Sequence, residues 1–130
     1  MLVDTDVLIW LTRGHPGAAA RLKRTEKRWI SAVTYIELAQ GCRSKSELER
    51  VRKALNDGGM PIAPVTEIIC ERAMRLIDRH ALGDGLQLGD ALIAATALEH
   101  GWTLLTANFK HFAAIEDLNV DRFDPAQGAG

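Results

Sequence analysis

Short apolar stretches alternate with helical stretches along almost the whole chain, and this alternation limits the folds that it can adopt. The apolar stretches are brief, and most are bounded by acidic, glycine, proline or hydroxyl residues, as strands of a covered sheet are. The expected strands span residues 1–4, 29–33, 62–65, 102–106 and 118–123. Strands that alternate with helices predict an α/β fold, in which a mainly parallel sheet is covered by helices on both faces.

The segments between these strands have the apolar spacing and the capping residues of helices. Thr66 is positioned to cap the clearest of them, and Ile69, Ala73 and Leu76 fall on one face of that helix. The helix that opens at Asp90 is apolar nearly all round, so we expect it to lie at the centre of the protein. The expected helices span residues 7–11, 18–25, 34–41, 66–82, 90–100 and 108–115, with another from Ser44 or Ser46 to Gly58.

Length and composition are those of one small domain. The chain has 130 residues, which predicts a single domain over 1–125 and a disordered tail over 126–130. Only Cys42 and Cys70 are present, which excludes a disulfide framework and a cysteine-rich zinc site. We find neither a secretion signal nor an apolar run long enough to span a bilayer, so no membrane association is expected. A reducing cytoplasm is the expected location.

Charge is distributed unevenly between the two halves. Residues 1–60 hold 11 Lys and Arg against 7 Asp and Glu, whereas residues 61–130 hold 5 against 10. Basic residues in the first half could bind a phosphate backbone, and Arg21, Lys23 and Arg24 are the candidates for RNA contact. The alternative is that these side chains are simply the solvated face of a helix.

Acidic and amide side chains follow several of the expected strands. Asp4 and Asp6 come where the first strand ends, Glu37 lies in the helix after the second, and Asp90 begins the apolar helix. Asn108 follows the strand at 102–106. Because ligand sites of parallel sheets form at the carboxyl ends of the strands, these residues should share one rim. Taken singly, Asp90 could be a helix cap, Glu37 an exposed helix residue and Asp4 an ordinary strand-end acid.

The chemistry of such a rim points to a divalent cation. Clustered carboxylates repel one another, and a bound cation relieves that repulsion. Ligands that are all oxygen suit Mg²⁺ or Mn²⁺, and such ions can activate water and stabilise the leaving oxygen of a phosphodiester. The four histidines lack metal-ligand spacing, and the sequence contains no phosphate-binding loop or serine-nucleophile motif.

Four segments resemble, in order, the motifs of PIN-domain nucleases. Residues 2–9 resemble the opening strand and turn of that family, and residues 30–38 resemble its second acidic motif. Residues 88–97 and 105–112 resemble the third and fourth motifs. In size the chain is similar to the VapC toxins of bacterial toxin–antitoxin pairs.

This resemblance implies a three-layer α/β/α sandwich and a Mg²⁺- or Mn²⁺-dependent endoribonuclease that acts on tRNA or rRNA. It also implies a homodimer and a VapB-like antitoxin that blocks the site. By motif position, Asp4, Glu37 and Asp90 match the catalytic, metal-binding acids. Asp6 stands where the family often has Asn or Ser, so we expect Asp6→Asn to retain much of the activity.

The fourth motif departs from the family pattern. Family members often carry a further Asp there, whereas this chain has Asn108 and His111. Asn108 and Thr106 could still supply oxygen atoms, although the lost charge should weaken metal binding. Two alternatives stay open at this point. One is a PIN-like binding module without catalysis, and the other is a haloacid-dehalogenase-like phosphatase, suggested by Asp4-Thr5-Asp6.

Overall fold

The central sheet is parallel throughout, as the alternating pattern predicts. The structure is a computed structural model that describes residues 1–126, so residues 127–130 of the predicted disordered tail lie outside the described residues. β1 pairs with β4 and β4 with β5, and β2 pairs with β3, all in parallel. The strands are β1 (Leu2–Val3), β2 (Ile30–Ser31), β3 (Ile62–Ala63), β4 (Leu104–Thr106) and β5 (Val120–Arg122).

A single bridge joins the two parts of the sheet. Leu2 and Trp29 form a parallel bridge, in which the Val3 amide donates to the Trp29 carbonyl at 2.8 Å. The Trp29 amide donates to the Met1 carbonyl at 2.9 Å. The strand order is therefore β3-β2-β1-β4-β5, which puts the carboxyl ends of β1, β2 and β4 side by side.

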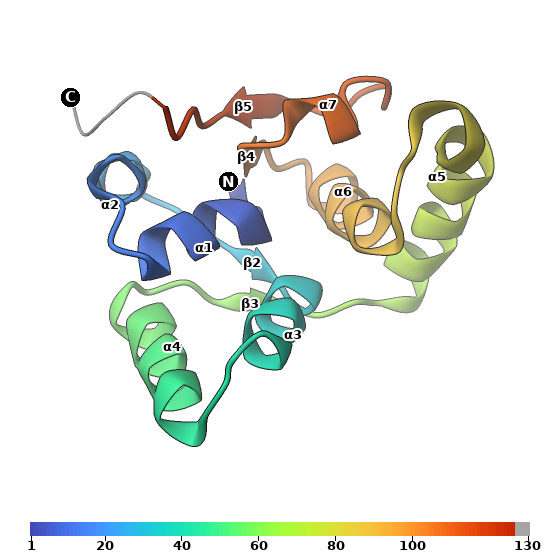
Figure 1. The fold of residues 1–130 in the computed structure, drawn as a ribbon. Coiled ribbons are helices and arrows are strands. Elements are labelled where there is room, and N and C mark those ends of the chain that lie inside the picture. The colour runs from blue at the N-terminus through green and yellow to red at the C-terminus, as the bar shows by residue number, and fades with distance from the viewer. Residues whose placement is uncertain (127–130) are drawn as a thin grey trace.

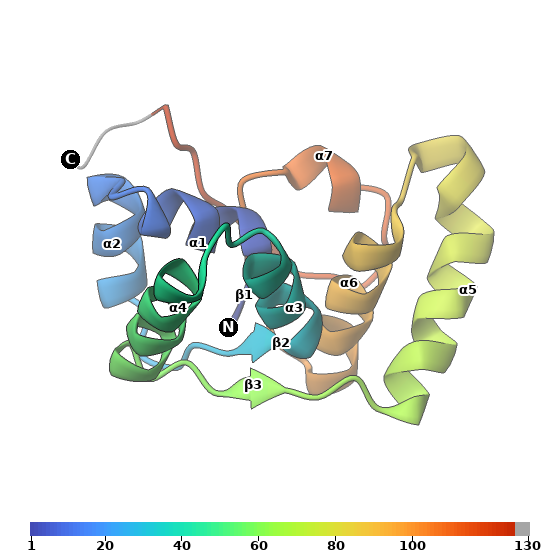
Figure 2. The ribbon, with the colours of Figure 1, turned by 60° about the horizontal axis from the view of Figure 1, so that its bottom comes forward.

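Helices cover both faces of this sheet. In Figures 1 and 2, α5 and α6 lie on one side of the molecule and α1, α2, α3 and α4 toward the other. Within residues 1–126, no helix is both long and apolar enough to cross a membrane. The helices are α1 (Thr5–Thr12), α2 (Pro16–Lys23), α3 (Ala32–Gln40), α4 (Lys45–Asp57), α5 (Glu67–Asp84), α6 (Leu88–His100) and α7 (Phe109–Phe112).

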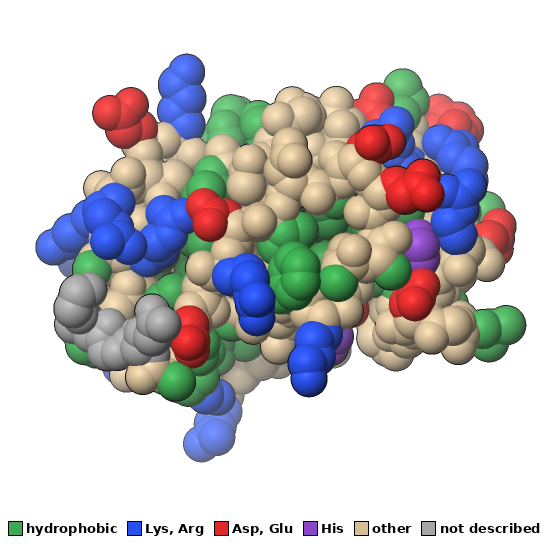
Figure 3. Space-filling model, turned by 90° about the horizontal axis from the view of Figure 1, so that it is seen from above, with side chains coloured by type: hydrophobic (Ala, Val, Ile, Leu, Met, Phe, Trp, Pro, Cys, Tyr) green, Lys and Arg blue, Asp and Glu red, His purple; other side chains and the backbone are tan. Residues whose placement is uncertain are grey.

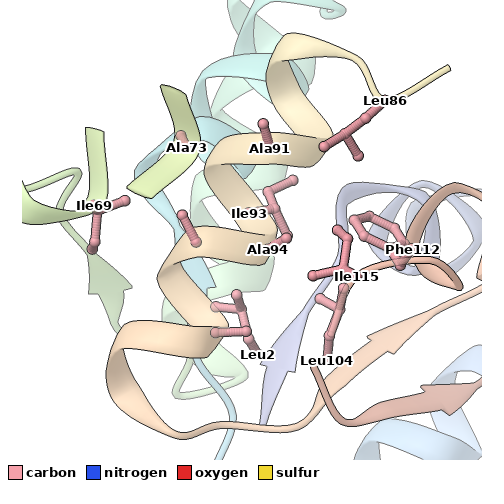
Figure 4. Close-up of a cluster of buried hydrophobic side chains, with 12 residues drawn as sticks. Leu2, Ile69, Ala73, Leu86, Ala91, Ile93, Ala94, Leu104, Phe112 and Ile115 are labelled. Atoms are coloured by element: carbon pink, nitrogen blue, oxygen red, sulfur yellow. The ribbon is translucent and has the colours of Figure 1, made fainter. Parts of the chain in front are cut away.

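Successive residues of the central strands belong to two different hydrophobic cores. Leu2 and Leu104 are paired in register and pack with α5, α6 and α7 (Figure 4). Val3 and Leu105, the next pair, pack with side chains of α1, α2, α3 and α4. Because neighbouring side chains of a strand point to opposite faces, the two cores lie on opposite sides of the sheet. The implied three-layer α/β/α architecture is thus confirmed.

Several element boundaries differ from those that the sequence predicts, and three of these differences fall within the segments that carry the predicted site residues. The strand expected over 29–33 ends at Ser31, whose hydroxyl accepts from the Val33 amide at 3.0 Å and so begins α3 early. α6 begins at Leu88 rather than at Asp90, because Gln87 is its N-cap. The helix expected over 108–115 is confined to α7, although Ile115 remains buried against the core.

His15 joins the start of α2 to the end of the described chain. Its Nδ1 accepts from the Ala18 amide at 3.1 Å, and its Nε2 lies 2.8 Å from the Pro125 carbonyl. The ring also makes T-shaped contacts with the rings of Trp10 and Phe123. We expect His15→Ala to lower the free energy of unfolding by about 1–2 kcal/mol, since one helix cap and one further hydrogen bond are removed.

Urea unfolding of the purified protein measures this decrease. His15→Asn is the matched control, because a shorter Asn can still cap α2 but cannot also reach Pro125. Its stability should lie between those of the wild type and the alanine variant. Equal stability of all three proteins would mean that the His15 contacts contribute nothing.

Candidate active site

Asp4 and Asp6 lie together where β1 ends and α1 begins. Asp4 is the N-cap of α1: its Oδ1 accepts from the Thr5 amide at 2.8 Å, and its Oδ2 accepts from the Thr106 hydroxyl at 2.7 Å. Asp6 Oδ2 accepts from the Ala107 amide at 3.1 Å and lies 3.3 Å from the Thr106 hydroxyl. The Asp6 carboxylate therefore faces the end of β4.

The environment of this pair opposes negative charge. Burial, and then the neighbouring Asp6, raise the pKa of Asp4 from 3.8 to about 7, against hydrogen bonds from Thr106 and Thr5 that lower it. Burial also raises the pKa of Asp6, although hydrogen bonds oppose the shift. Asp6 Oδ1 is buried and has no hydrogen-bond partner among the described residues. A buried carboxylate oxygen without a partner is costly, so this atom is available to a ligand that brings positive charge.

Glu37 is connected to this pair through Thr5. The Thr5 hydroxyl donates to Glu37 Oε1 at 2.8 Å and lies 3.0 Å from the Thr34 hydroxyl, while the Thr5 amide binds Asp4. On the other side, a Cβ atom added at Gly89 would stand 3.3 Å from Glu37 Oε2. The absence of a side chain at Gly89 therefore lets Glu37 approach the first turn of α6, where the helix dipole favours a carboxylate.

Asp90 stands at the third position of α6, where it serves as part of a capping box. Its Oδ2 accepts from the Gln87 amide at 3.4 Å and lies 3.3 Å from Nδ1 of His111. Asp90 is close enough to Asp4 to contribute to the raised pKa of that residue. The capping role considered for Asp90 from the sequence is thus present, and it coexists with a position beside the acidic pair.

The predicted site residues divide into one hydrogen-bonded cluster and two neighbours. Asp4, Asp6 and Thr106 form the cluster, and the backbone amide of Asn108 donates to Thr106 Oγ1 at 3.0 Å. Glu37 joins through Thr5, and Asp90 through charge alone. Across residues 1–126, no three His, Cys, Asp or Glu side chains converge as a ready-made metal site. The side-chain amide of Asn108 does not cap α7.

The predicted basic patch is not a set of free cations. Arg21 forms an ion pair with Asp121 of β5, with 2.6 Å between the charged atoms, and it is mostly buried. The Arg21 guanidinium is therefore already engaged by an acid, whereas Lys23 and Arg24 are exposed. Seen from above, Lys and Arg side chains gather at the end of the molecule where α2 lies, and acidic side chains are commoner toward α5 (Figure 3).

Sequence reasoning missed the uncharged residues that hold the acids in place. Thr5 binds Glu37, Thr34 binds Thr5, and Gly89 makes room for Glu37. The one signal available was the presence of hydroxyl residues inside two otherwise apolar motifs. Their partners lie 29 to 32 positions away along the chain, a pairing that sequence spacing does not specify.

Comparison with known protein families agrees with this geometry. The PIN domain family model matches residues 1–118, a range that contains Asp4, Asp6, Glu37 and Asp90. The chain belongs to the PIN-domain family. The haloacid-dehalogenase alternative is therefore not supported.

Relatives of this PIN domain cover nearly its whole length. It is 37% identical over 122 residues to Ribonuclease VapC10 of Mycobacterium tuberculosis, covering 91% of this chain and 90% of the relative. A toxin–antitoxin complex from Klebsiella pneumoniae matches with a TM-score of 0.78 and 33% identity, over 95% of this chain and 96% of that one. VapBC2 of Rickettsia felis, solved with a promoter DNA fragment, matches with a TM-score of 0.81 but 19% identity, over 95% of this chain and 98% of that one. This last likeness concerns the fold alone.

Thr106 is the residue in this PIN domain that touches both members of the acidic pair. Thr106→Val keeps the shape of the side chain but removes the hydroxyl from Asp4 and Asp6. We expect Mn²⁺ affinity to fall about 10- to 100-fold, the usual effect of removing a group that orients a metal ligand. Isothermal titration with Mn²⁺ measures the change, and Thr106→Ser, which keeps the hydroxyl, is the control. Equal affinities for the valine and serine variants would contradict this role.

Proposed function

We propose that this PIN-domain protein is a Mg²⁺- or Mn²⁺-dependent endoribonuclease and the toxin of a toxin–antitoxin pair. The observation that carries the proposal is the pair of buried Asp4 and half-buried Asp6 at the end of β1, with a raised pKa at both residues and one oxygen without a partner. Support for RNA as the substrate comes from the ribonuclease named among the relatives, at 37% identity.

The donor atoms at the site fit a hard divalent cation. Asp4, Asp6, Glu37 and Asp90 offer only oxygen atoms, and Asp6 Oδ1 has no competing hydrogen bond within residues 1–126. Mg²⁺ keeps several waters and often binds proteins through one or two carboxylates, so it does not need three converged side chains. Asp4 and Asp6 would hold such an ion, with Glu37 and Asp90 facing its waters or the substrate. This proposal gives Asp6 a larger role than its motif position implies, so Asp6→Asn should lose more activity than the sequence alone suggests. A cation bound there would supply an activated water and neutralise charge on the phosphate.

The chain's own residues have separate tasks in this proposal. Thr106 donates to Asp4 and keeps Oδ2 of that carboxylate in a fixed position. Thr5 fixes Oε1 of Glu37 and leaves Oε2 near the first turn of α6. Glu37 is exposed, whereas Asp4 is buried. Glu37 is therefore the first of these two acids that an approaching RNA strand would contact. Asn108 can direct its side-chain amide toward a phosphate or a water.

The partners of the protein also belong to this proposal. The 33% identical chain of the toxin–antitoxin complex supports a VapB-like antitoxin as a partner. We also propose a homodimer, in which exposed apolar side chains on α3, α5 and α6 would be buried. These side chains are Ile36, Ile68, Met74, Leu82 and Leu88. The substrate would be tRNA or rRNA, and the free thiols of Cys42 and Cys70 agree with a reducing cytoplasm.

Cleavage of RNA by the purified protein tests the proposal. Total tRNA and ribosomal RNA are incubated with the protein in EDTA, in Mg²⁺ and in Mn²⁺, and the products are separated on denaturing gels. Internal cleavage that requires the cation and stops on addition of the antitoxin is the expected result. A protein that neither cleaves RNA nor binds Mn²⁺ would instead be a PIN-fold binding module, the remaining alternative.

A further inference from the structure

A cleft opens beside Glu37, between the end of α1, the helix α3 and the helix α4. In Figures 1 and 2, α3 lies beside both α1 and α4, and the cleft has a volume of about 720 Å³. Its floor is apolar and includes Leu38 and Val51, which are buried residues. Its size lies within the range of about 300–1,000 Å³ that ligand pockets commonly have.

Three arginines from three different parts of the chain line this cleft. Arg13 follows α1, Arg43 precedes α4, and Arg50 lies within α4. All three are exposed, and none takes part in an ion pair within the described residues, where the ion pairs involve other side chains. The cleft also holds two acids. One is Glu37, and the other is Glu47, whose carboxylate accepts from the Arg43 backbone amide at 3.1 Å.

We infer that this cleft binds a single-stranded stretch of the RNA substrate next to the phosphate that is cleaved. The inference rests on the proposed function. Unpaired guanidinium groups bind phosphate oxygens through paired, charge-assisted hydrogen bonds, so Arg13, Arg43 and Arg50 would contact the backbone. The aliphatic floor would pack against an unstacked base, and an arginine side chain could stack on its face.

Two observations favour this cleft over the α2 surface as the RNA site, and a third favours RNA over a peptide as its ligand. The cleft shares Glu37 with the acidic site, so a strand lying in it leads directly to the metal-binding pair. By contrast, Arg21 on the α2 surface is occupied by its ion pair with Asp121. An excess of unpaired arginine over acid favours a polyanion, whereas a wholly apolar groove would favour a peptide helix.

The test measures RNA binding separately from cleavage. The full chain carrying Arg13→Gln, Arg43→Gln and Arg50→Gln is compared with wild type by fluorescence anisotropy, using a labelled single-stranded oligoribonucleotide in EDTA. We expect the Kd to rise about tenfold or more, and the slope of log Kd against log salt to fall by about 2, or roughly 0.7 for each phosphate that is no longer bound. In Mg²⁺, KM should rise while kcat at saturating RNA stays within about twofold of wild type.

A second triple variant controls for the change in net charge. Arg72→Gln, Arg75→Gln and Arg79→Gln on α5 remove the same charge from a helix that does not border the cleft. This variant should keep a Kd and a salt slope close to those of wild type. Single variants of Arg13, Arg43 and Arg50, each expected to lower the slope by roughly 0.7, keep the test valid should the triple variant fail to fold.

The outcomes separate this inference from the proposed function. If wild type cleaves RNA but the cleft variant binds it with unchanged Kd and slope, the inference is overturned and the proposed function stands. The inference is also overturned if both triple variants weaken RNA binding equally. If the cleft variant binds the antitoxin less tightly but binds RNA as wild type does, the inference is also overturned, since the cleft would then be a protein-binding groove. If wild type neither binds nor cleaves RNA, both the inference and the proposed function fail.

Discussion

Asp4→Asn, Glu37→Gln and Asp90→Asn should each reduce metal-dependent RNA cleavage by about a thousandfold or more while the fold is retained. A divalent ion stabilises the transition state of phosphodiester cleavage by several kcal/mol, and each factor of ten in rate corresponds to about 1.4 kcal/mol. Asp4 is bound to both Thr5 and Thr106, and its amide replacement keeps the size of the side chain, so the local structure should survive.

Two measurements check this expectation. Cleavage rates on a defined RNA are compared at saturating Mg²⁺, and each variant is also expressed in bacteria without its antitoxin to measure toxicity. Glu26→Gln, which neutralises an exposed acid outside every motif, is the control and should behave as wild type. A Glu37→Gln variant as toxic as wild type would show that the proposed site is wrong.

Without metal, the protein should become less stable as the pH rises from about 4 to about 7. The pKa of Asp4 is 3.8 in an unperturbed chain and about 7 in the folded protein, so over this range the folded state binds more protons than the unfolded state. Stability therefore falls with rising pH through this window, by a few kcal/mol for a shift of this size. The raised pKa of Asp6 acts in the same direction.

Melting curves across this pH range in EDTA, Mg²⁺ and Mn²⁺ measure the effect. Asp4→Asn cannot ionise, so it should melt higher than wild type near pH 8 in EDTA and should vary less with pH. A cation that binds only the native state adds about 2.7 kcal/mol at a hundredfold excess over its Kd, so Mn²⁺ should restore wild type at high pH and affect Asp4→Asn less. If both proteins gain equally from Mn²⁺, the ion binds elsewhere.

The layers of this fold can be predicted from local sequence because its two central strands, β1 and β4, are short and begin with paired apolar residues. Leu2-Val3 and Leu104-Leu105 each supply one residue to each core, and no polar residue interrupts them. The boundary of α6 is harder to predict. Asp90 is the conspicuous residue of its first turn, yet the helix begins at Leu88 and Gln87 provides the N-cap, an arrangement that depends on backbone hydrogen bonds rather than on residue type.

The acids of the site can be predicted because parallel strands end at the same rim, but their partners cannot. Thr106 reaches Asp4 across 102 positions, and Arg21 reaches Asp121 across 100. Such pairs depend on the order of the strands and on the position of α2, neither of which is encoded in local spacing. For this reason the sequence indicates Thr106 only as one of several oxygen donors, and it makes Arg21 look like a free cation that could bind RNA.

The position of Thr5 has a consequence for redesign of this protein. Thr5 binds Asp4 with its backbone amide and Glu37 with its hydroxyl, so the positions of the two acids depend on the same residue. A designer who wishes to change the spacing of the acids, and with it the choice of ion, cannot move one and leave the other. Thr5→Val would release Glu37 and spare the contact to Asp4, which makes position 5 the natural place to begin such a redesign.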